Sequence, residues 1–126
     1  MHNRNYIEWG DLTDLYIPVE ASTNQVKSFA MLFTDDFGCE KGELEAMAYL
    51  HHQDYTHTIC SGDHIVFRML AILDRDACTV SMETVLRSNQ FSTKYLRDQF
   101  REAFRTKWIS IGKQDARQER GLRRKK

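Results

Sequence analysis

The sequence predicts an α/β fold in which a small parallel sheet is flanked by helices and followed by a C-terminal helix and a basic tail. Two observations predict it. Helical and strand-like patterns alternate between residues 42 and 87, in the order helix, strand, helix, strand, helix. Strands joined by helical crossovers pair in parallel, which gives a small parallel sheet. A length of 126 residues suffices for one ordinary hydrophobic core but not for two, so one domain is expected.

Two segments precede the alternating region. Residues 15–21 are rich in β-forming side chains, but Pro18 lacks a backbone donor, which predicts an edge strand or an extended entry. Residues 22–24 (Ser-Thr-Asn) are suited to cap a short helix that carries Val26, Phe29, Ala30 and Phe33. The polar segment that starts at Asp35 ends this helix.

The alternating region begins with a helix at Gly42. Leu44, Met47, Ala48 and His51 follow the i, i+3, i+4, i+7 spacing of one helix face. A short β-branched strand is predicted over residues 56–60 and a second helix over 64–73. Another strand follows over residues 77–80, and Ser81 is a natural cap for a helix over 82–87.

The last helix is predicted to start near Ser92 or Thr93 and to end near Trp108. Its expected buried stripe consists of Leu96, Phe100, Ala103 and Phe104. The apolar pattern stops after Gly112. The predicted organisation is therefore one domain over residues 1–112 and a basic flexible tail over 113–126, because the tail has little apolar surface to offset its ordering entropy.

The bulk composition is that of a globular protein, with 41% hydrophobic and 29% charged residues. No apolar run approaches the roughly 18 residues that span a bilayer, and the first residues lack the apolar core of a signal peptide. Three cysteines without a C-x-x-C spacing suit reduced thiols. A cytoplasmic location is expected.

Two acidic residues, Glu43 and Asp63, stand where predicted helices begin. Asp63 follows a predicted strand, and residues just past the ends of parallel strands gather at one edge of the sheet. Paired carboxylates there can hold Mg²⁺ or Mn²⁺ and activate water for phosphodiester cleavage. A structural interpretation is also open: Glu43 favours the first turn of its helix, and Asp63 caps the next one.

The order of these motifs resembles the PIN-type nuclease family. The resemblance rests on Gly-Glu-Leu-Glu-Ala at residues 42–46, Ser-Gly-Asp at 61–63 and Thr-Val-Ser-Met-Glu-Thr-Val-Leu at 79–86, and it covers roughly residues 38–88. It implies a metal-dependent nuclease fold that acts on RNA or single-stranded nucleic acid. Glu43 and Asp63 would be its catalytic, metal-binding acids, and Glu45 would assist from the same helix.

One departure from the family pattern leads to a second interpretation. The family places its first metal-binding Asp on an opening strand, whereas Asp11 and Asp14 precede the strand-like residues here. The chain then resembles the later half of such a domain. It would be a catalytically inactive regulatory or partner-binding module, of the kind found in defence, toxin–antitoxin or mobile-element loci, completed by a protein partner or by a second copy of itself.

Two further groups of residues bear on ligands. The tail has seven Lys or Arg against two acids, a net charge of +5 that leaves −5 on the rest of the chain. Such a tail is expected to bind nucleic-acid phosphates, with a plain solvated end as the alternative. Its residues chosen for this role are Arg117, Arg120, Arg123, Arg124, Lys125 and Lys126. The second group would offer zinc ligands, but only Cys60 and His64 have suitable local spacing, and histidines of ordinary helix faces and turns are the preferred interpretation. This group consists of Cys39, His51, His52, His57, Cys60 and His64.

Overall fold

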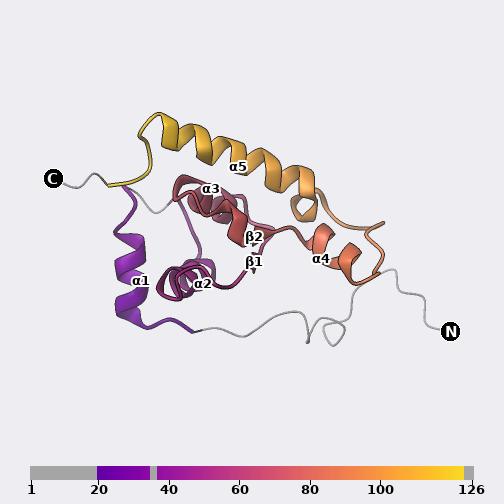
Figure 1. The fold of residues 1–126 in the computed structure, drawn as a ribbon, viewed down its shortest axis with the longest axis horizontal. Helices are drawn as coiled ribbons and strands as arrows, with labels where there is room; N and C mark the ends of the chain where they lie inside the picture. The colour runs from indigo at the N-terminus through magenta and orange to yellow at the C-terminus, as the bar shows by residue number, and fades with distance from the viewer. Residues whose placement is uncertain (1–19, 35–36, 124–126) are drawn as a thin grey trace.

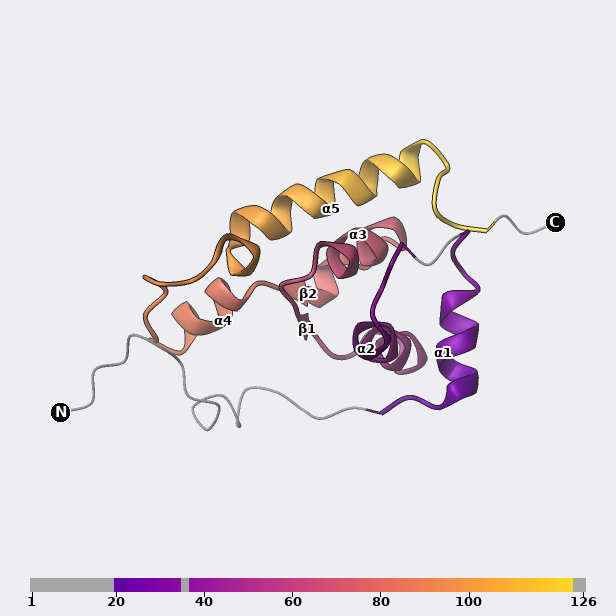
Figure 2. The same ribbon diagram turned by 180° about the vertical axis from the view of Figure 1, so that it is seen from behind.

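The structure, a computed structural model, describes residues 20–34 and 37–123. Helix α3 (His64–Ile72) lies between α5 (Glu102–Arg117) and α2 (Lys41–His52), and α1 (Thr23–Ala30) packs on α2 (Figure 1). The view from behind shows the same order (Figure 2). Among the described helices, none combines the length and the apolar character needed to cross a membrane.

The predicted parallel sheet is confirmed, in a smaller form. Strands β1 (Ile59–Cys60) and β2 (Thr79–Val80) pair in parallel with Ile59 opposite Thr79, and α3 forms the crossover between them. Both strands are shorter than the predicted 56–60 and 77–80. The second prediction was too long because residues 76–78 form the 3₁₀ helix η2 (Asp76–Cys78). The hydroxyl of Thr79, which follows η2, donates to the Asp76 carbonyl at 2.6 Å.

Side-chain caps fix the starts of three helices, as the sequence predicted. Ser22 caps α1 through a capping box with Gln25. Asp63 caps α3, and Ser81 accepts from the Thr84 amide at the start of α4 (Met82–Ser88). Such caps satisfy amides that have no partner inside the helix. The edge strand predicted over residues 15–21 lies almost entirely outside the described residues.

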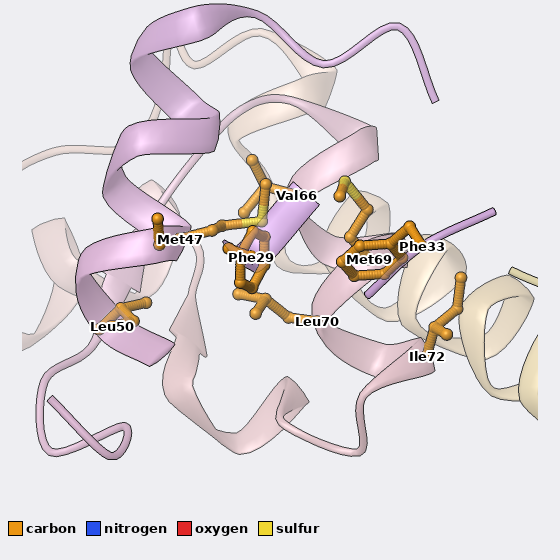
Figure 3. Close-up of a cluster of buried hydrophobic side chains, with 9 residues drawn as sticks. Phe29, Phe33, Met47, Leu50, Val66, Met69, Leu70 and Ile72 are labelled. Carbon is orange, nitrogen blue, oxygen red and sulfur yellow. The ribbon is translucent and has the colours of Figure 1, made fainter. Parts of the chain in front are cut away.

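Helix α3 is apolar on both sides, which explains its central place. Six of its nine residues are buried. One side joins the main core with side chains from α1 and α2, which converge around Phe29 (Figure 3). The other side places Phe67 and Ala71 against Ile109 of α5. The main core consists of Phe29, Phe33, Met47, Ala48, Leu50, Val66, Met69, Leu70 and Ile72.

The predicted position of the last helix is wrong at both ends. α5 begins at Glu102 rather than near Ser92, because the preceding residues form a turn and the 3₁₀ helix η3 (Asp98–Phe100). The buried Glu83 carboxylate of α4 accepts from the Glu102 amide at 2.8 Å and so fixes the start of α5. The Arg101 guanidinium donates to the carbonyls of Thr93 and Leu96 and holds the turn.

The C-terminal end of α5 lies beyond the predicted boundary at Gly112. A side chain at Gly112 would clash with α3, since its Cβ would lie 2.4 Å from the Arg68 carbonyl oxygen. Helices α3 and α5 therefore pack closely at Gly112, and α5 continues beyond it to Arg117. Asp115 is 3% exposed and bonds to Arg68 Nε at 2.7 Å. The first part of the expected flexible tail is therefore helix, and its helical pattern was missed because its buried residues are Gly112 and Asp115 rather than large apolar ones.

The segment after α5 returns to α1. Leu122 forms an antiparallel bridge with Phe33, and the Thr34 amide donates to the Gly121 carbonyl at 2.8 Å. The Arg123 amide donates to the Leu32 carbonyl, also at 2.8 Å. These backbone bonds anchor residues up to 123 on the domain.

Candidate functional site

The two acids predicted to form a site lie at the starts of two neighbouring helices. Asp63 follows β1, and its amide donates to Ser61 Oγ at 2.9 Å, which forms the tight turn between strand and helix. Asp63 Oδ1 then accepts from the Ile65 amide, also at 2.9 Å. This oxygen is engaged with the backbone of α3, while the carboxylate as a whole remains 22% exposed.

Glu43 lies in the first turn of α2, where the capping residue Glu40 makes no side-chain cap. Unpaired helix-start amides favour negative charge at such a position. Nevertheless, Glu43 Oε2 is fully buried and has no hydrogen-bond partner among the described residues. A buried oxygen of this kind is costly unless a proton or a cation accompanies it.

The structure brings the Glu43 and Asp63 side chains into contact. Burial is the largest cause that raises the pKa of Glu43 to about 7, and the adjoining Asp63 carboxyl group and the negative charge of Glu40 add to the rise. The backbone of Glu40 opposes this shift in part. Two facing carboxyl groups cannot both ionise cheaply, so the pair retains a proton near neutral pH or exchanges it for a cation.

The third acid in the sequence assignment does not join the pair. Glu45 is two residues beyond Glu43 on the same helix, and residues with this spacing project from different faces. Within residues 20–34 and 37–123, no three His, Cys, Asp or Glu side chains converge as a metal-binding group. Asp11 and Asp14 lie outside the described residues.

The surroundings of Asp63 include aromatic residues that the sequence interpretation did not assign to the site. The ring of His64, next to Asp63, lies 4.4 Å from that of Trp108 on α5. The ring of Phe100 lies against Gly62, where an added Cβ would approach it to 2.3 Å. The α4–α5 connection is therefore fixed beside the acidic pair. The helix prediction hid this arrangement, since it placed Phe100 inside a helix.

No family model, curated protein or solved structure matches this chain. The PIN-type resemblance therefore remains a prediction from the sequence motifs.

The residues considered for zinc have other contacts. His51 Nδ1 lies 2.8 Å from the Tyr55 hydroxyl, and burial lowers the pKa of His51. The His57 ring contacts Tyr49, and Cys60 is an exposed free thiol. These side chains are spread over α2, the segment after it and β1.

The basic residues predicted to bind nucleic acid differ in their environments. Arg117 is exposed in the last turn of α5. Arg120 lies 3.3 Å from Asp115 Oδ1, which partly neutralises it, although 61% of its side chain is exposed. Arg123 is exposed, and its backbone amide is bonded to Leu32. Arg124, Lys125 and Lys126 lie outside the described residues.

Proposed function

We propose that this protein is a PIN-like, divalent-cation-dependent nuclease domain that acts on RNA or single-stranded nucleic acid. The observation that supports it is the contact between Glu43 and Asp63 at the starts of α2 and α3, beside the end of β1. Open α/β folds bind ligands at this edge of a parallel sheet. The motif order around the pair, over roughly residues 38–88, resembles the family pattern.

The two carboxyl groups fit Mg²⁺ or Mn²⁺. Both cations prefer carboxylate oxygens, and the buried Glu43 Oε2 has no protein partner among the described residues. A cation there would offset the repulsion between the two negative charges. When bound, it supplies a Lewis acid and a water of lowered pKa for phosphodiester hydrolysis.

The chain's own residues orient this pair. The Ser61 hydroxyl and the Ile65 amide hold Asp63 in its turn, so the carboxylate does not need to reorganise. Helix α2 holds Glu43 against it. Exposed basic residues near the C-terminus, such as Arg117 and Arg123, would attract the phosphate backbone that the acidic remainder of the chain repels.

Cleavage of labelled single-stranded RNA and DNA in Mg²⁺ and in Mn²⁺ tests the proposal. Asp63→Asn should abolish cleavage and keep the fold, since Asn is also a good helix cap. Asp74→Asn is the matched control, because the Asp74 side chain is 94% exposed and projects from a turn. Intact substrate in both metals with the wild-type chain would refute nuclease activity of this chain alone.

A second candidate is a catalytically inactive regulatory or partner-binding module. It is favoured by the structural roles of both acids, because Asp63 caps α3 and Glu43 occupies the first turn of α2. Light scattering and co-purification test it, and it predicts a heteromer or a self-associated state. A monomer that cleaves nucleic acid would contradict it.

A further inference from the structure

The turn between α4 and α5 presents an exposed aromatic ring between two cations. Tyr95 is 61% exposed, one of two large hydrophobic side chains with such exposure among the described residues. Lys94 Nζ lies 5.4 Å from the centre of its ring. Arg97 follows two residues later and is also exposed. Neither Lys94 nor Arg97 forms an ion pair within the described part of the chain.

This turn, residues 92–97, is held firmly although its tip is exposed. The Arg101 guanidinium donates to the Thr93 carbonyl at 3.2 Å and to the Leu96 carbonyl at 3.0 Å. The Lys94 amide donates to Ser92 Oγ, and the Leu96 amide donates to the Thr93 carbonyl. A ring on such a turn loses little conformational entropy when it stacks on a ligand.

The turn is also anchored next to the acidic pair. Arg101 Nη1 lies 3.5 Å from the buried Glu83 carboxylate, and the Phe100 ring packs against Gly62. Gly62 immediately precedes Asp63. The same connection thus begins at the exposed Tyr95 and ends beside the residues proposed to hold the cation.

Charge is divided along the chain in a way that suits a polyanion at this turn. Residues 20–81, which include Glu43 and Asp63, have ten acids and four Lys or Arg, a net charge of −6. Residues 82–107 have six Lys or Arg and three acids, a net charge of +3. Two of those acids, Glu83 and Glu102, already pair with arginines of α4 and α5. Lys94 and Arg97 are exposed and form no ion pair among the described residues, so they are available to a phosphate backbone.

We infer that residues 92–97 form a binding surface for single-stranded nucleic acid, with Tyr95 stacking on a base and Lys94 and Arg97 contacting phosphates. Aromatic rings flanked by cations are the usual platform for unpaired bases, which expose a π-face that a duplex hides. The inference rests on the proposed function and deepens it, because it names the surface that delivers the substrate to Glu43 and Asp63. It adds this turn to the exposed basic residues near the C-terminus as a second contact for the strand.

The test is fluorescence anisotropy of a labelled oligo(U) of about 12 nucleotides, with an oligo(dT) and a duplex for comparison, in EDTA. Tyr95→Ala should weaken oligo(U) binding by roughly 5- to 100-fold, and Tyr95→Phe should keep it within about twofold. Replacing Lys94 and Arg97 by Gln should lower the slope of log affinity against log salt by about 1.4. Lys27→Gln, an exposed lysine on α1, is the matched charge control and should bind as the wild type does.

The outcomes separate this inference from the proposed function. Wild-type affinity in Tyr95→Ala and in the Lys94 and Arg97 double variant would overturn it, as would preference for the duplex or no binding of oligo(U) by the wild type at low salt. EDTA removes any contribution of a metal site to these measurements. Binding through Tyr95 without cleavage in Mg²⁺ or Mn²⁺ would support the surface and refute the nuclease. Cleavage that Tyr95→Ala leaves unchanged in KM would refute the surface alone.

Discussion

Replacing Glu43 by Gln is expected to make the protein more stable at alkaline pH. The pKa of Glu43 is raised from 4.5 to about 7, so the folded state holds this proton more tightly than the unfolded state does. Stability from this group is fully present below about pH 4.5 and is lost as the pH rises towards 7. Gln is neutral at every pH and has almost the same shape, so it escapes this loss.

The size of the effect follows from the shift. At about 1.4 kcal/mol per pKa unit, the rise corresponds to an upper bound of roughly 3 kcal/mol above pH 7. Glu43 is partly exposed, so solvent screening reduces this figure, and the charge lost from the first turn of α2 costs about 0.3–1 kcal/mol. A net gain of about 1 kcal/mol at about pH 8 is expected, which corresponds to a rise of roughly 3–6 °C in Tm for a domain of this size.

The assay is urea unfolding followed by circular dichroism at about pH 5 and about pH 8 without divalent cations. Glu43→Gln should exceed the wild type in free energy of unfolding at the higher pH and match it within about 0.5 kcal/mol at the lower. Asp74→Asn, which removes an exposed carboxylate, serves as the control. A variant that is less stable than the wild type at pH 8, or a difference that does not change with pH, would refute the assigned contact with Asp63.

Three further predictions concern α5 and its surroundings. Gly112→Ala should lower the free energy of unfolding by about 2 kcal/mol or more, because the new Cβ meets the α3 backbone. Gly42→Ala places its Cβ in open space and should be neutral or stabilising by up to about 1 kcal/mol. Chemical denaturation of both variants tests this pair of predictions. Asp115→Ala should cost about 2–3 kcal/mol, since it leaves Arg68 without its 2.7 Å partner, and an unchanged Tm would show that the pair is not formed. Deletion of residues 113–126 should lower Tm strongly, because it removes the end of α5. An unchanged Tm would contradict the position of that helix end.

The order of elements between residues 22 and 88 could be predicted because local chemistry specifies it. Ser22, Asp63 and Ser81 each satisfy amides at the start of the following helix, and apolar spacing marks the helices themselves. The same local signals placed Glu43 and Asp63 at helix starts. Their mutual contact then followed from the βα turn at the end of β1.

The position of α5 could not be predicted, because distant residues decide it. Leu96, Phe100 and Phe104 have helical spacing, yet Arg101 binds the carbonyls of the turn and Glu83 caps Glu102 from another helix. Glu83 lies 19 residues before the amide that donates to it, and Arg101 folds back on carbonyls eight and five residues before it instead of continuing a helix. The exposed Tyr95 turn is a consequence of this late start.

The end of α5, expected to be a flexible tail, could not be predicted for a similar reason. The sequence after Gly112 lacks large apolar residues, but a close approach of backbones and a buried ion pair replace them as packing contacts. A buried Asp with an Arg on a helix 47 residues away leaves no periodic signal in a single sequence.

The central claim, that Glu43 and Asp63 together hold a divalent cation, is tested most directly by calorimetric titration of the chain with Mn²⁺ at about pH 8, where the acid pair readily exchanges its proton. The wild type and Asp74→Asn should bind one Mn²⁺ with the same affinity. Glu43→Gln and Asp63→Asn should each bind at least about tenfold more weakly, since even outer-shell substitutions cost roughly 10–100-fold. No saturable binding by the wild type, or wild-type affinity in Asp63→Asn, would contradict the claim.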